Sequence, residues 1–212
     1  MKKINFKTIL ILAVANCFIF SNTQSQINNQ IIVKVGDEII TSVDIKNEIM
    51  TNLLINNQEI SQNIIDQSKN FAIKKLINKS IKKSEIEKYE IKDYNQIDLQ
   101  NYIKSVAKNL NTNTNDLKEI FSQSNISYQT FVDSRKIELL WNTLIFQIYR
   151  NQTNINTVEV ENEFEQVKKN ENEEELKELK QKILNKKKEE KLSLFSRSHF
   201  SNLENTVIIN FK

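Results

Sequence analysis

The residues able to do chemistry are few and lie far apart. The chain of 212 residues contains one cysteine, Cys17, one glycine, Gly36, and one histidine, His199. One Cys and one His cannot form a zinc site of such ligands, and any serine or cysteine nucleophile would depend on His199 as its base. A single glycine also disfavours phosphate-binding loops, which need several glycines. We therefore expect no catalytic residue, no cofactor and no metal.

The remaining candidates for chemistry have plainer structural explanations. Glu159 and Glu163 stand at i,i+4, a spacing that would suit acid–base work, but carboxylates on the polar face of a helix are normally solvated. His199 lies near the end of a C-terminal helix, where a capping or surface position is expected. Trp141 falls on the apolar face of a helix, which is typical of a core anchor. These patterns favour binding over catalysis.

Residues 1–25 have the three parts of a secretory signal. A basic start precedes an apolar run over residues 9–20, and small residues at Thr23 and Ser25 offer a cleavage site. The apolar run is shorter than the ~20 residues that a membrane-spanning helix needs. We expect the segment to be removed on export to a bacterial periplasm. The alternative is lipidation of Cys17, although Asn16 stands where a lipoprotein signal prefers a small residue.

The charge of the mature chain excludes some partners. Removing residues 1–25 takes three of the 30 Lys and Arg residues and none of the 27 Asp and Glu residues, which leaves the mature chain close to neutral. Binding to nucleic acid lacks its main driving force, because that force is a basic excess that neutralises phosphates. We expect no nucleic acid partner and no stable membrane insertion of the mature chain.

The elements that position these residues are predicted to be mostly helical. The chain has no proline, which favours long helices. Two β-prone runs, 31–35 and 38–40, flank Gly36-Asp37 and predict a hairpin with a tight type II′ turn. Apolar residues at helical spacing, with capping residues before them, then predict six helices, beginning near Ser42, Ser61, Ile97, Leu117, Ser127 and Asn156.

The C-terminal third predicts a charged helix and a strand. Residues 171–191 are rich in Glu and Lys, and pairs such as Glu173 with Lys177 stand at i,i+4, which is typical of a solvated helix. Apolar residues return from Leu192 onward. The run 206–211 predicts a strand, and we expect it to pair with the N-terminal hairpin, so that the two ends of the mature chain meet in one small sheet.

The order of these elements resembles that of the SurA-type periplasmic chaperones. Residues 31–44 resemble the opening hairpin and capped helix of the family, and residues 71–77 its second helix. The most specific stretch is 103–138, which contains the segments Val-Ala-Lys-Asn, Leu-Lys-Glu-Ile-Phe and Ser-Tyr-Gln-Thr-Phe. Residues 155–160 resemble the end of the family's N-terminal domain, and 192–211 its C-terminal helix and strand.

The resemblance implies a fold and a division of the chain. The implied fold is mainly α, a multi-helix module like the SurA N-terminal domain, with a small antiparallel sheet from the N-terminal hairpin and a C-terminal strand. We expect a signal peptide at 1–25, the helical domain at 26–168, a charged helix at 169–191, and a C-terminal helix and strand at 192–212. The family usually carries parvulin prolyl isomerase domains where this chain has only the charged helix.

The resemblance also implies a function. The expected role is that of a periplasmic holdase that binds unfolded outer-membrane proteins and has no enzymatic activity. The alternatives are a prolyl isomerase or a subunit that recruits one, and a structural helical protein that pairs with a partner helix. The candidate peptide-binding residues are apolar side chains at helical spacing that would otherwise belong to the core: Leu53, Leu54, Phe71, Phe121, Tyr128 and Phe131.

Overall fold

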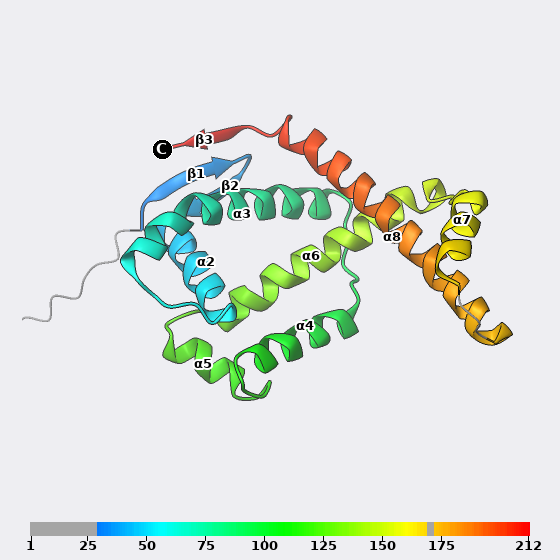
Figure 1. Ribbon diagram of the computed structural model, residues 1–212. Helices are drawn as coiled ribbons and strands as arrows, with labels where there is room; N and C mark the ends of the chain where they lie inside the picture. Colours follow the sequence, from blue (N-terminus) through cyan, green and yellow to red (C-terminus); the bar gives the residue numbers. More distant parts are fainter. Residues whose placement is uncertain (1–28, 169–171) are drawn as a thin grey trace, which may run out of the picture.

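The computed structural model describes residues 29–168 and 172–212, and its architecture is mainly α with one small sheet (Figure 1). The expected fold class is thereby confirmed. The predicted signal peptide at 1–25 lies outside the described residues. In chain order the elements are β1 (Ile31–Val35), β2 (Glu38–Thr41), α2 (Ser42–Ile55), α3 (Gln62–Lys88), α4 (Gln96–Asn109), α5 (Leu117–Gln123), α6 (Tyr128–Tyr149), η1 (Arg150–Gln152), α7 (Thr157–Val167), α8 (Glu173–Glu204) and β3 (Ile209–Phe211).

The sheet joins the two ends of the described chain. Its order is β2-β1-β3, and both pairings are antiparallel. Val35 pairs with Glu38, so Gly36 and Asp37 form a two-residue turn; φ is +56° at Gly36 and is not positive at Asp37, as in a type II′ turn. β3 adds to the free side of β1, with Phe211 opposite Val33. The predicted pairing of the C-terminal strand with the hairpin is confirmed.

Side-chain caps set the starts of the helices. Thr41 forms a capping box with Asp44 at the start of α2, and Ser61 and Ser127 cap α3 and α6 through their hydroxyl oxygens. Asn156 also caps α7, but its side chain accepts from the Val158 backbone N–H, and the capping box predicted with Glu159 does not form. Asn125, with φ of 54°, follows the end of α5 as expected.

The core consists of three clusters of buried side chains. The first lies between the sheet and helices α2 and α3, where Val33 is fully buried. The second joins α4, α5 and α6 around Phe121 and Leu117. The third packs α6 against the end of α3 and against α8, and its centre is Trp141, which is 2% exposed. Trp141 is therefore a core anchor, as its position predicts, and its Nε1–H donates to Ser196 Oγ at 2.8 Å.

The charged segment differs from its prediction. It continues without a break into the C-terminal helix, so that α8 runs as one helix from Glu173 to Glu204. It is not merely a solvated helix, because one face packs on α7: Ile183 is buried, and Lys186 and Lys187 both pair with Glu163 of α7, at 3.0 and 2.8 Å. The hydrogen bonds from these lysines, led by Lys187, lower the pKa of Glu163 below its ordinary value.

Candidate functional site

An apolar groove opens between β1, α2 and α3. It has a volume of about 520 Å³. Four residues at its rim are polar, namely Ser42, Lys46, Gln62 and Lys69. The rest of its lining is aliphatic or thioether, contributed by Ile32, Ile45, Ile49, Met50, Ile65 and Ile73. We call this surface the apolar groove. Its walls contain no acidic residue, and its chemistry suits apolar side chains of a bound molecule.

Local sequence signals build both walls of the groove. The capping box of Thr41 starts α2, which places Ile45 and Ile49 one helical turn apart on the same face. Ser61 starts α3, and Ile65 and Ile73 stand two turns apart on the side that faces α2. Because side chains at i,i+4 share a face, Ile45 and Ile49 form an apolar stripe on α2, whereas on α3 Lys69 stands between Ile65 and Ile73 in the lining of the groove.

The rim of the groove is basic. Lys46 is exposed and has no recorded acidic partner in the part of the chain that the structure describes. Lys69 pairs with Asp66 at 2.7 Å, but both side chains are about half exposed, so water and salt weaken this pair strongly. Two ammonium groups beside an apolar floor favour a ligand that combines apolar side chains with a carboxylate.

A second hollow, the charged cleft, lies between α2, α3, α4 and α6. Its volume is about 300 Å³. Glu48 is 7% exposed there, and it accepts from Lys75 at 2.5 Å and from Asn52 Nδ2 at 3.0 Å. The Arg135 guanidinium lies 4.6 Å from the centre of the Tyr102 ring. Glu48 and Lys75 satisfy each other as an ion pair that joins α2 to α3, whereas the buried Arg135 Nε has no hydrogen-bond partner among the described residues.

Three of the predicted peptide-binding residues meet in one aromatic cluster. The Phe121 ring lies 4.8 Å from that of Phe131 and 5.6 Å from that of Tyr128, and Tyr102 stacks on Phe131 at 5.7 Å. Phe121 is fully buried and Phe131 is 4% exposed, whereas Tyr128 is half-buried. Burial raises the pKa of both tyrosines above the ordinary value. A client could reach the two phenylalanines only if the helices moved apart.

The other three predicted residues lie apart from this cluster and from one another. Leu53 is 2% exposed in the core beside the sheet, and Leu54 is half-buried against the α4–α6 core. Phe71 on α3 is 64% exposed. None of the six lines the apolar groove, and the peptide-binding role of the set stays a prediction.

The groove residues were missed as a set by sequence reasoning. Ile45 and Ile49 stand at helical spacing in one predicted helix and Ile65 lies in the next, but either apolar stripe alone indicates only a buried face. An open groove differs from a buried contact in that the apolar stripes of two helices face each other without packing together. This depends on how α2 and α3 are arranged in space.

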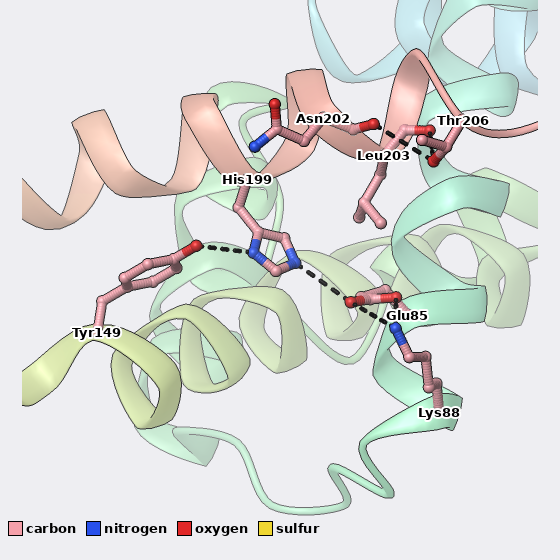
Figure 2. Close-up of polar contacts among 7 residues, drawn as sticks. All are labelled: Glu85, Lys88, Tyr149, His199, Asn202, Leu203 and Thr206. Atoms are coloured by element: carbon pink, nitrogen blue, oxygen red, sulfur yellow. Dashed lines mark hydrogen bonds and ion pairs between the residues drawn. The ribbon is translucent and has the colours of Figure 1, made fainter.

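A polar network links α3, α6 and α8 (Figure 2). The Tyr149 hydroxyl of α6 bonds His199 Nδ1 of α8 at 2.9 Å, and His199 Nε2 bonds a Glu85 carboxylate oxygen of α3 at 3.2 Å. Lys88 also pairs with Glu85, at 3.2 Å. His199 therefore occupies neither the cap nor the surface position expected of it, and its geometry is that of a structural bridge.

Within the described residues there is neither a metal-ligand cluster nor a membrane-spanning helix. No group of three or more His, Cys, Asp and Glu side chains is arranged to hold a metal ion there. None of the helices in the described ranges combines the length and the apolar character needed to cross a membrane.

The similarity of this chain to known proteins is to solved structures. No family model matches the chain, and no curated protein matches it. Among solved structures, it is similar to a chain from the study of the virulence factor PEB4 and the periplasmic protein Cj1289, two structurally related SurA-like chaperones in Campylobacter jejuni. The sequences are 17% identical, the alignment covers 87% of this chain and 99% of that chain, and the TM-score is 0.43.

Proposed function

We propose that the protein is a periplasmic chaperone that holds unfolded polypeptides, outer-membrane proteins among them, in the apolar groove. One observation carries the proposal: six apolar side chains line a solvent-accessible groove whose rim is polar and basic. An unfolded chain exposes apolar side chains of many shapes, and flexible aliphatic walls with a Met50 side chain accommodate such variety better than fixed polar contacts would. The order of sequence segments shared with SurA-type chaperones supports the choice of clients and compartment.

The proposed activity needs no chemistry. The only histidine is engaged with Tyr149 and Glu85, which leaves it bonded on both ring nitrogens. α7 ends at Val167 and α8 begins at Glu173, so the sequence between them is far shorter than the ~100 residues of an additional isomerase domain. We propose that the protein acts by binding alone.

The experiment that tests the function measures protection of a client. The purified mature protein is mixed with an unfolded outer-membrane β-barrel as the denaturant is diluted, and aggregation is followed by light scattering. We expect the protein to suppress aggregation, and the variant Ile65→Glu to lose most of this effect, because a carboxylate in the groove opposes burial of apolar client side chains.

A matched control shows whether the groove is responsible. Ile97 is 66% exposed on α4, outside the groove, so Ile97→Glu makes the same chemical change elsewhere. Thermal unfolding of both variants identifies any loss of folding. If the wild-type protein fails to suppress aggregation, the function is wrong. If the two variants lose activity equally while both stay folded, the groove is not the binding site.

A further inference from the structure

Strand β3 leaves one edge of the sheet open. Gly36 N–H donates to Ile208 O at 3.0 Å, and Lys212 N–H donates to Ile32 O at 2.9 Å. The backbone groups of alternate strand residues point to the same side, so those of Asn210 also face β1. The N–H and C=O groups of Ile209 and Phe211 must then point away from β1. Within the described residues no strand lies on that side, since the sheet order is β2-β1-β3 (Figure 1).

The open edge has only part of the usual protection against strand addition. Natural edge strands are commonly kept very short, or are blunted by a lysine, a proline, a bulge or an inward-pointing charge, and of these β3 has its length of three residues and the lysine that follows it. β3 has the sequence Ile-Asn-Phe, and the irregularity in the sheet lies between β1 and β2 instead. Ile208, just before the strand, is 70% exposed, and Phe211 is 67% exposed. The edge therefore presents free backbone donors and acceptors together with uncovered apolar side chains.

The space beside this edge has an apolar floor. Phe211 pairs with the fully buried Val33, so its side chain lies on the α3 side of the sheet. A cavity of about 390 Å³ there is lined by Phe211 and Ile209 with residues of α3 and the end of α8, namely Asn70, Ile73, Lys74, Ile77, Asn78 and Glu204. Phe71 follows Asn70 around α3 at 100° per residue, on the flank opposite to Ile73, and is 64% exposed. A strand laid beside β3 would lie over this flank.

The charges near the edge favour an acidic residue in the ligand. Lys74 lines the cavity and Lys212 follows β3, and neither has a recorded acidic partner in the ranges that the structure describes. Glu204, the last residue of α8, lines the same cavity. An extended segment with a carboxylate near Lys74 would therefore gain an ion pair in addition to its backbone hydrogen bonds.

We propose that β3 binds an extended segment of an unfolded polypeptide as a fourth strand of the sheet. Hydrogen bonds to the backbone of Ile209 and Phe211 hold the segment without regard to its sequence, and alternate apolar side chains pack over Phe211 and Phe71. This inference rests on the proposed function and deepens it, since it names an extended strand as a conformation in which clients are held. It also assigns a role to Phe71, a predicted binding residue that lies outside the apolar groove.

The test uses backbone-modified peptides with the intact protein. The probe is a fluorescent peptide of about six residues, the usual length of a strand, in which valine and threonine alternate and one threonine is replaced by aspartate. Two versions carry N-methyl groups on alternate residues, one on the valines and the other on the remaining positions. In an added strand only one set of N–H groups faces β3. The version methylated on the N–H groups that face β3 should therefore bind roughly tenfold more weakly than the unmodified peptide. The version methylated on the opposite set should bind nearly as well as the unmodified peptide.

Protein variants locate the site. Phe211→Pro removes a backbone donor from the open edge and places a ring there, whereas Phe211→Ala removes the aromatic side chain and keeps the donor. We expect Phe211→Pro to weaken binding more than Phe211→Ala does, with unfolding temperatures that show both variants to be folded. Phe71→Ser should weaken binding moderately.

Three results would overturn the inference. The first is that both N-methylated peptides bind as well as the unmodified one, and the second is that no peptide binds. The third is a concentration-dependent dimer that Phe211→Pro abolishes, because the edge would then pair with a second copy of this chain. The aggregation assay separates this inference from the proposed function. If the protein suppresses client aggregation but the peptide does not bind at β3, only the inference is wrong. If the peptide binds at β3 but client aggregation is not suppressed, only the proposed function is wrong.

Discussion

A hydrogen bond of 3.2 Å joins His199 Nε2 to Glu85 Oε1, although 114 positions separate the two residues in the sequence. The carboxylate is 6% exposed on α3, and the imidazole comes from α8. Buried carboxylates are costly unless they are paired, so the contact with His199 and that with Lys88 together make this carboxylate tolerable in the core. The bond fixes α8, the longest helix, against the helical core.

Removing the imidazole should destabilise the whole module. His199→Ala removes one partner of Glu85, which keeps Lys88, and the partner of the Tyr149 hydroxyl, and each hydrogen bond lost costs about 0.5 to 1.5 kcal/mol. Urea unfolding measures the free energy of unfolding. Ser198→Ala, at an exposed position on the same helix, should change it little. Equal unfolding free energies for His199→Ala and the wild type would show that the bridge contributes nothing.

The contact between α7 and α8 should weaken in acid. Because the pKa of Glu163 is lowered in the folded protein, its ion pairs stabilise the fold above the ordinary pKa of 4.5, and this contribution is lost as the pH falls through the lower folded-state value. Glu163→Gln should therefore unfold more easily than the wild type at neutral pH and equally well in strong acid. Salt should shrink the difference, since these side chains are partly exposed to solvent.

The control for this prediction is Glu178→Gln on α8. Glu178 is exposed and has no recorded ion pair among the described residues, so its substitution should leave the unfolding midpoint nearly unchanged at either pH. A difference between Glu163→Gln and the wild type that persists in strong acid would contradict the electrostatic explanation.

Deleting residues 204–212 should lower both stability and chaperone activity. The deletion removes β3 and the partly buried Val207 and Ile209, which pack on the core beside the sheet. Loss of these contacts should reduce the free energy of unfolding by roughly 2 to 4 kcal/mol. Thermal unfolding and the aggregation assay check this together. A truncated protein that melts and protects clients as the intact one does would show that the tail is an independent appendage.

The mature protein should not accelerate proline isomerisation. A proline-containing test peptide should isomerise at its uncatalysed rate, over tens to hundreds of seconds at 25 °C, in the presence of the pure protein. A known parvulin added to the same assay supplies the positive control. Clear acceleration by this protein would instead favour the alternative in which it is a prolyl isomerase.

The sequence by itself determined the elements whose causes are local. Gly36 permits the positive φ of the hairpin turn, and the hydroxyls of Thr41, Ser61 and Ser127 start their helices by bonding backbone groups only three positions away. The hairpin and the C-terminal strand were also predictable as partners, because an isolated hairpin is marginal in water and the chain offered one further strand. Such signals act through neighbours along the chain or through the need to complete a sheet.

Tertiary structure alone decided the groove, the bridge and the open edge. Ile49 and Ile73 each belong to an ordinary apolar stripe, and only the angle between α2 and α3 leaves a groove between the two stripes. Likewise, no pattern near His199 indicates Glu85, because packing of α8 across α3 and α6 brings them together. Burial is a property of the packed molecule, so Phe121 and Phe71, both aromatic residues at helical positions, end at 0% and 64% exposure.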